Sequence, residues 1–240
     1  MMRTFALACW LVSGVVVASS GGIPLEDPRV DLKDIASLRK GAETFAHYCL
    51  TCHSASFMRY SRIGQDLGWS EEEVLNRLVS TNSKIGDPMT VAMPKAEAKK
   101  WFGRVPPDLS VITRSRGSEW VYTYLKSFYL DPARPFGVNN LVFKDVGMPH
   151  VLWELQGYAE PIIEDHDGHK VVTGAKVVQP GRYTPEQYEQ TVHDLVNFLT
   201  YVGEPSKIER QQLGMWVLLF LAVFTALAYL LKREYWRGIH

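Results

Sequence analysis

Two uncharged apolar runs lie near the two ends of the chain, with a mixed polar and apolar sequence between them. The first run, residues 5–18, follows a single basic residue, Arg3, and precedes the small residues of "SSGG". A basic, an apolar and a small-residue segment in this order are typical of a secretory signal peptide, and the run is shorter than the roughly 20 residues that a membrane span needs. We predict a signal peptide over residues 1–20.

The second run, "LGMWVLLFLAVFTALAYLL", carries no charge, and basic residues flank it, with Arg210 before and Lys232 after. A helix of this length crosses the roughly 30 Å hydrocarbon core of a bilayer. We therefore predict a single transmembrane anchor with a short tail over residues 207–240. Because a signal peptide directs export of the body of the chain, we expect residues 21–206 outside the membrane and the tail in the cytoplasm.

The middle of the chain has helical periodicity at two places. Residues 38–49 are compatible with a helix that puts Gly41, Phe45 and Cys49 on one face. The sequence "TPEQ" from Thr184 has the residues of a helix start, with proline at the first position and glutamine at the third. An amphipathic stripe comes next, made of Tyr188, Val192, Leu195, Leu199 and Val202. We expect these two helices to cross.

The remaining segments contain many turn residues. The stretches "RVPPDLS" and "DPARPF" predict much loop and no long sheet. We interpret the acidic stretch Glu160, Glu164, Asp165 and Asp167 as a solvated loop, which could also steer a basic partner. The fold class predicted is mostly α, with long loops and one C-terminal transmembrane helix.

Composition and cysteine content exclude some classes of function. Basic and acidic residues number 26 each, so no net charge favours nucleic-acid binding. Of the 3 cysteines, Cys9 lies in the predicted signal peptide, which leaves Cys49 and Cys52 in the exported body. A structural zinc site needs about four ligands, and no second cysteine pair exists to supply them.

The two remaining cysteines lie in "CLTCH", directly before His53. A redox dithiol of the thioredoxin kind expects a βαβ context that the sequence lacks, and a disulfide between cysteines so close is strained. The pattern is that of c-type haem attachment, in which both thiols bond to the haem and the histidine binds its iron. We predict one haem c attached through Cys49 and Cys52, with His53 as a ligand of the iron.

The second axial ligand has several candidates among the residues. Methionine as the second ligand suits an iron that shuttles one electron. Two methionines are excluded as this ligand, because Met58 is too close to His53 in the chain and Met215 lies in the predicted anchor. Met148, between Gly147 and Pro149 in a stiff loop, ranks slightly ahead of Met93. The alternatives to Met148 are Met89, Met93 and, for a haem with two histidine ligands, His150.

The segments "CLTCH", "VPPDLSVITRSRG" and "DVGMPHVLWELQG", with an anchor ending "KREYW", together resemble the cytochrome c1 family. The resemblance covers nearly the whole chain after the predicted signal peptide. It implies a haem domain like the class I cytochromes c, with Met148 as the sixth ligand of the iron. It also implies that an arginine after the PPDLS segment contacts a haem propionate, and Arg116 fits that position best, with Arg114 as the neighbouring alternative.

The resemblance further implies electron transfer within the respiratory bc1 complex, from the Rieske iron–sulfur protein to cytochrome c. Cytochrome b, the Rieske subunit and membrane lipid would be the neighbours, and the chain would contribute no catalytic group of its own to this quinol–cytochrome c oxidoreductase. A long Arg-rich presequence is absent, which favours a bacterial inner membrane with the haem domain in the periplasm. The alternatives are a monohaem subunit of a terminal oxidase, a haem sensor with an open sixth site, and a thiol oxidoreductase.

Overall fold

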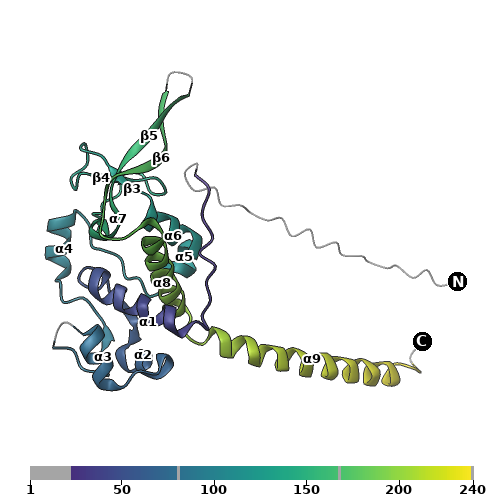
Figure 1. Ribbon diagram of the computed structural model, residues 1–240. Helices are drawn as coiled ribbons and strands as arrows, with labels where there is room; N and C mark the ends of the chain where they lie inside the picture. The colour runs from purple at the N-terminus through teal and green to yellow at the C-terminus, as the bar shows by residue number, and fades with distance from the viewer. Residues whose placement is uncertain (1–22, 80–81, 167–168, 239–240) are drawn as a thin grey trace.

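The computed structural model describes residues 23–79, 82–166 and 169–238 (Figure 1). About half of these residues form helices, and the helices of the body surround one main hydrophobic core. Three two-stranded sheets are also present in the described residues, two of them short and one a long hairpin. The elements in chain order are α1 (Ile35–Thr44), the π-helical turn η1 (Phe45–Cys49), β1 (Ala55–Arg59), α2 (Tyr60–Leu67), α3 (Glu71–Leu78), β2 (Pro88–Met89), α4 (Lys95–Phe102), α5 (Ile112–Arg116), α6 (Ser118–Lys126), β3 (Phe128–Leu130), β4 (Val138–Asn140), α7 (Trp153–Gln156), β5 (Gly157–His166), β6 (His169–Pro180), α8 (Pro185–Gly203) and α9 (Lys207–Tyr235).

The predicted crossing of an early and a late helix is confirmed, since α1 lies across α8 (Figure 1). Thr184 caps α8 through a capping box with Gln187, and proline occupies the first turn. The apolar stripe of α8 is buried along its whole length. At the crossing, the rings of Phe45 and Phe198 lie 5.8 Å apart. The helical periodicity of the sequence therefore identified the pair of helices that forms the core.

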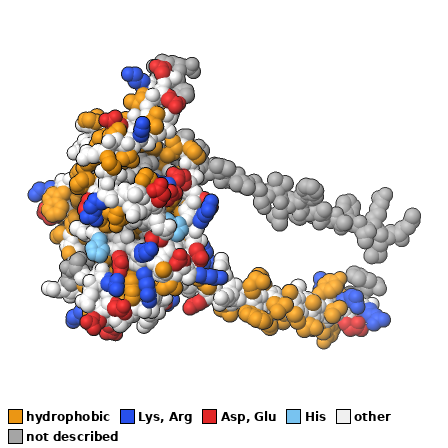
Figure 2. Space-filling view, viewed as in Figure 1, with side chains coloured by type: hydrophobic (Ala, Val, Ile, Leu, Met, Phe, Trp, Pro, Cys, Tyr) orange, Lys and Arg blue, Asp and Glu red, His pale blue; other side chains and the backbone are white. Residues whose placement is uncertain are grey.

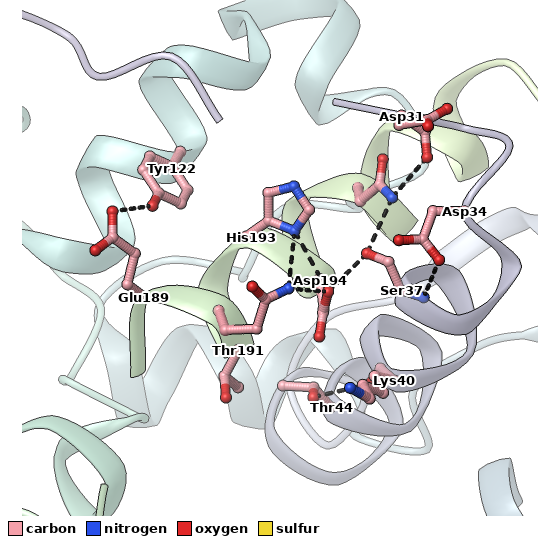
Figure 3. Close-up of polar contacts among 12 residues, drawn as sticks. Asp31, Asp34, Ser37, Lys40, Thr44, Tyr122, Glu189, Thr191, His193 and Asp194 are labelled. Atoms are coloured by element: carbon pink, nitrogen blue, oxygen red, sulfur yellow. Dashed lines mark hydrogen bonds and ion pairs between the residues drawn. The ribbon is translucent and has the colours of Figure 1, made fainter. Parts of the chain in front are cut away.

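A buried polar cluster accompanies this crossing (Figure 3). The Ser37 hydroxyl of α1 donates a hydrogen bond to Asp194 Oδ1 of α8 at 2.6 Å, and Gln190 Nε2 donates to the same oxygen at 2.9 Å. Asn197 Nδ2 donates to the backbone oxygen of Asp31 at 2.8 Å. These bonds give the buried carboxylate its partners and fix the segment before α1 against α8.

The expectation of no long sheet is wrong for residues 157–180. There β5 and β6 pair as an antiparallel hairpin from Gly157↔Pro180 to His166↔His169, and the hairpin projects from the body of the molecule (Figure 1). Glu160, Glu164 and Asp165 are solvent-exposed, but they belong to strand β5 rather than to a loop. Asp167 lies outside the described residues. The β-branched residues of "VVTGAKVV" outweigh the turn residues around them, because branched side chains favour a pleated strand.

The C-terminal helix α9 leaves the body of the molecule as an isolated rod (Figure 1). It has 29 residues, and none of them is buried. Figure 2 shows apolar side chains along it between charged residues near its ends. Residues 213–231 of α9 carry no charge, and an apolar surface of this length is unstable in water, so α9 has the length and composition of a membrane-spanning helix. The signal peptide predicted over residues 1–20 lies outside the described residues.

Candidate functional site

A cavity of about 290 Å³ lies between η1, α5, α6, α8 and the loop that contains Met148. Leu195 and Leu199 of α8 form part of its wall. The cavity also brings together residues that are far apart in the sequence and that sequence analysis singled out. Those residues are Cys49, Cys52, His53, Arg116 and Met148.

The two cysteines are positioned by the π-helical turn at the end of α1. Cys49 is its last residue and is 8 % exposed, and its backbone oxygen accepts hydrogen bonds from the amides of Cys52 and His53 at 3.0 and 2.8 Å. Burial, with a smaller effect of Cys52, raises the pKa of the Cys49 thiol to about 12. A redox-active dithiol needs a thiolate near neutral pH, so this environment disfavours a thiol oxidoreductase.

His53 is oriented by a single hydrogen bond. Its Nδ1 lies 2.7 Å from the backbone oxygen of Pro107. Because a carbonyl oxygen only accepts, Nδ1 must carry the hydrogen, and Nε2 keeps its lone pair for a metal ion. Burial lowers the pKa of this histidine, against smaller opposing effects of Pro107 and Asp108, so the ring is neutral as a ligand requires.

The PPDLS segment fixes the chain just after His53. Asp108 Oδ2 accepts hydrogen bonds from the backbone nitrogen and the hydroxyl of Ser56, at 3.0 and 2.6 Å. The amide of Leu109 donates to the backbone oxygen of Ser54 at 2.7 Å, and the hydroxyl of Ser110 accepts from the amide of Phe57 at 3.1 Å. Sequence analysis used this segment as a sign of loop structure and as a family marker, and the structure adds a physical role in orienting His53.

Met148 is the methionine that lines the cavity together with the CxxCH residues. Its sulfur accepts a hydrogen bond from the phenolic hydroxyl of Tyr124, with the two atoms 3.3 Å apart. Met93 lines a different pocket, beside Leu50 and Thr51. His150 is buried with its ring stacked on Phe128, at a centroid distance of 4.9 Å, and it is not part of the cavity wall.

Two consecutive buried asparagines shape the loop that leads to Met148. Asn140 Oδ1 accepts hydrogen bonds from the amides of Val142 and Phe143, at 2.9 and 3.1 Å, and its Nδ2 donates to the backbone oxygen of Tyr124 at 2.8 Å. Asn139 Oδ1 accepts from the amide of Asp145 at 2.9 Å. These residues were absent from the sequence analysis, although adjacent asparagines in a segment that becomes buried are a usable signal for a hydrogen-bonded turn.

The arginines of the site are Arg116 and Arg104. The Arg116 guanidinium lies 5.2 Å from the ring centre of Trp120, which in turn stacks on Tyr124 at 5.0 Å. Arg114, the alternative to Arg116, is not part of the cavity wall and instead approaches Gly203. Arg104 does line the cavity, and sequence analysis missed it because it precedes the recognised motif.

The residues of this cavity fit a haem. The wall is mostly aliphatic and aromatic, and a neutral imidazole, a thioether and two thiols face one space. Within the described part of the chain, two guanidinium groups and no carboxylate contribute to this wall, which suits a group with two propionates. The donor set is thus the one that a covalently attached, hexacoordinate c-type haem requires.

Comparisons with known proteins agree with this chemistry. The model of the cytochrome C1 family matches residues 29–239. Cytochrome c1 of Allochromatium vinosum is 49% identical over 244 residues, which cover all of both chains. A protein of Nitrosomonas europaea named ammonia monooxygenase gamma subunit is 47% identical, over 100% of this chain and 99% of its own. Cytochrome c1 of Rhodospirillum rubrum is 25% identical, over 95% of this chain and 93% of its own.

Two of these comparisons assign the chain to a family. The family model matches most of the chain, and one relative matches it over its full length. The helical haem-domain architecture and the C-terminal anchor are consistent with it. The spacing of Cys49 and Cys52 is the one that covalent haem attachment requires. The chain therefore belongs to the cytochrome c1 family, the membrane-anchored c-type cytochromes of the bc1 electron-transport complex, and carries one covalently bound haem c.

Proposed function

We propose that this protein accepts one electron from the Rieske iron–sulfur subunit and passes it to a cytochrome c. In this proposal, residues 1–20 direct export and are removed, residues 21–206 form a haem domain in the periplasm of a bacterium, and residues 207–240 form the anchor and a short cytoplasmic tail. Cytochrome b and the Rieske protein are the neighbours within the complex. Membership of the cytochrome c1 family supports the proposal.

Within the site, we assign thioether bonds to Cys49 and Cys52 and axial ligation to His53 Nε2 and Met148 Sδ. We assign a propionate contact to Arg116. The observation that carries these assignments is a single apolar cavity lined by all five residues. The hydrogen bond from His53 to Pro107 supports the choice of Nε2, and the positions of Met93 and His150 outside this wall support the choice of Met148.

The bound haem supplies a one-electron redox centre. The chain supplies a surrounding that keeps this centre in one place and in one ligation state. Pro107 fixes the ring of His53, the Asn139–Asn140 turn shapes the approach to Met148, and the α8 leucines exclude water. A low-dielectric surrounding and a thioether ligand both favour the reduced state, as an acceptor of electrons from an iron–sulfur protein requires.

The first test is a reduced-minus-oxidised optical spectrum and a redox titration of the purified membrane protein, compared with its Met148→Ala variant. We expect a c-type spectrum in both proteins and a sharply lower potential in the variant. Met93→Ala is the matched control and should leave the potential unchanged. If the reduction potential is unchanged in Met148→Ala and falls in Met93→Ala, the sixth ligand is instead Met93.

The route of the electron needs a second measurement. In membranes that contain the whole complex, a pulse of quinol should reduce the Rieske cluster and then cytochrome c. In the Met148→Ala complex we expect the Rieske cluster to be reduced while reduction of cytochrome c slows. Unchanged reduction of cytochrome c would argue against the route. Rapid binding of carbon monoxide to the unmodified protein would instead favour a haem sensor with an open sixth position.

A further inference from the structure

We infer that Arg104 is a second carboxylate-binding residue of the cavity and pairs with a propionate of the haem, beside the pairing assigned to Arg116. The inference rests on the proposed haem ligation. It concerns a residue outside the PPDLS segment that led to Arg116. It is carried by the position of Arg104, by its lack of a partner among the described residues, and by the charge of the cavity wall.

The backbone around Arg104 directs its side chain over the loop of Met148. Helix α4 ends at Phe102, and Gly103 comes next in a left-handed conformation with φ of 72°. The Arg104 side chain then lies across Gly147, where a Cβ atom would come within 3.2 Å of Nε and 3.6 Å of Cζ. A residue with a side chain at position 147 would therefore displace the guanidinium. The glycine next to Met148 gives Arg104 its place at the cavity.

The guanidinium of Arg104 makes no hydrogen bond or ion pair with any residue in the described ranges. Arg134 shows the contrast, because it forms ion pairs with Asp131 and Asp145. Arg104 lines the cavity that contains Met148, so its guanidinium is available to an anionic group bound there.

The charges of the cavity match those of the ligand. A haem brings two propionates, and an ionised carboxylate next to an apolar surface needs a cation or several hydrogen-bond donors. The described part of the wall offers Arg104 and Arg116 as cations and no carboxylate that would compete for them. One guanidinium would leave one propionate without a charged partner, and two guanidiniums from separate segments provide one for each.

Arg104 is solvent-exposed, so an acidic side chain of a docked protein could offer it the same chemistry. The two sources of a carboxylate differ in one measurable respect. A propionate is present in the isolated protein, whereas an acidic partner is present only during an encounter. The reduction potential of the isolated protein therefore separates them, because a negative charge that loses its cation favours the oxidised state of the haem.

The experiment is a redox titration of the purified full-length haem protein at several pH values, for Arg104→Gln, Arg104→Lys and Lys100→Gln. Lys100 is exposed on α4 and controls for the loss of one positive charge nearby. In Arg104→Gln we expect the ratio of oxidised to reduced protein at fixed ambient potential to rise about two- to fivefold, the range for an ion pair at an exposed rim. Arg104→Lys should recover part of the shift, and Lys100→Gln should show none.

A resonance Raman spectrum gives a second readout, in which the propionate bending bands should shift in Arg104→Gln and stay in place in Lys100→Gln. Unchanged potential and unchanged bands in Arg104→Gln would overturn the inference. If in addition the salt-dependent rate with cytochrome c fell, the carboxylate would belong to the partner, which also overturns it. If the proposed haem ligation were itself wrong, the unmodified protein would show no c-type spectrum, and this outcome is distinct from those above.

Discussion

Gly41 of α1 lies so close to Asp194 of α8 that a Cβ atom on the glycine would be 2.0 Å from the aspartate backbone oxygen. The two helices contact each other through their backbones at this point. Helix α1 continues into the turn that ends at Cys49, and α8 supplies Leu195 and Leu199 to the cavity wall. The close approach therefore sets the distance between the haem-attachment turn and the opposite wall.

We predict that Gly41→Ala destabilises the protein, because the added methyl group meets backbone atoms that can move only if the helices separate. Overpacking of this kind costs about 1–3 kcal/mol, which exceeds the gain of up to about 1 kcal/mol from the better helix propensity of alanine. Thermal unfolding of the haem protein measures the change. Gly86→Ala is the control, since no atom of the described residues, apart from its two chain neighbours, lies within 4 Å of its added Cβ. Equal unfolding temperatures for the two variants would contradict the prediction.

The hydrogen bond from Tyr124 to the Met148 sulfur predicts an effect on the redox equilibrium. A donor that engages a lone pair of the sulfur withdraws electron density from it and favours reduced iron. Tyr124→Phe keeps the ring contacts with Trp120 and Phe128 and removes only the hydroxyl. We expect a lower reduction potential in this variant and a loss of about 1 kcal/mol in stability.

A redox titration and a denaturant titration of Tyr124→Phe check the two parts of this prediction. Tyr129→Phe is the matched control, because Tyr129 is also buried and lies in β3, outside the cavity wall. A potential that falls equally in both variants would show a general effect of losing a buried phenol. The assignment of the effect to the sulfur would then be wrong.

The turn formed by the buried asparagines predicts a local weakening of the Met148 loop. In Asn140→Ala the amides of Val142 and Phe143 lose their acceptor, and unsatisfied buried donors cost about 1–3 kcal/mol each. We expect Met148 to be displaced more easily, so that carbon monoxide binds the reduced protein faster. Ser115→Ala removes an exposed hydroxyl and serves as control. Slow carbon monoxide binding in both variants would contradict a role of Asn140 in holding the ligand.

Asp108 predicts a pH dependence of stability. Burial raises the pKa of this carboxyl, but hydrogen bonds from Ser110 and Ser56 outweigh burial and hold it below the usual value of 3.8. A carboxyl with a lowered pKa in the folded protein stabilises it at pH values above the unfolded pKa. This stabilisation is lost as the pH falls through the folded value.

Asp108→Asn should therefore be less stable than the unmodified protein near neutral pH, and the difference in unfolding free energy should shrink in strong acid. Denaturant unfolding at a series of pH values measures this difference. Because the carboxyl is exposed, the effect near neutral pH will be small. A difference that stays constant into strong acid would mean that the hydrogen-bond geometry, and not the charge, is what Asp108 contributes.

Local patterns in the sequence predicted much of the helical architecture. The stripe from Tyr188 to Val202 and the cap at Thr184 depend on neighbours within a few positions, so they are legible without a structure. The hairpin β5–β6 was missed because nearby prolines and acidic residues suggested a loop. Its pairing depends on contacts between strands rather than on either strand alone.

The residues of the candidate site also fall into two groups, those that a local motif identifies and those that only folding brings together. Cys49, Cys52 and His53 lie close together in the chain, and a short motif was enough to single them out. The contacts of Pro107 with His53, and of Tyr124 with Met148, join residues brought together only by folding. No local spacing encodes these contacts, and this is why Arg104, Tyr124 and the asparagine turn were not predicted from the sequence.

The connection between α8 and α9 has a consequence for how the protein meets its partners. Only residues 204–206 separate the two helices, and such a short segment spans at most about 10 Å. Glu204 also accepts a hydrogen bond from Arg210 at 2.6 Å, which links this connection to the first turns of the anchor. The cavity wall formed by α8 is thus tethered closely to the lipid surface. With α9 in a bilayer, the haem domain diffuses laterally in two dimensions instead of tumbling freely, so its distance from the membrane varies little.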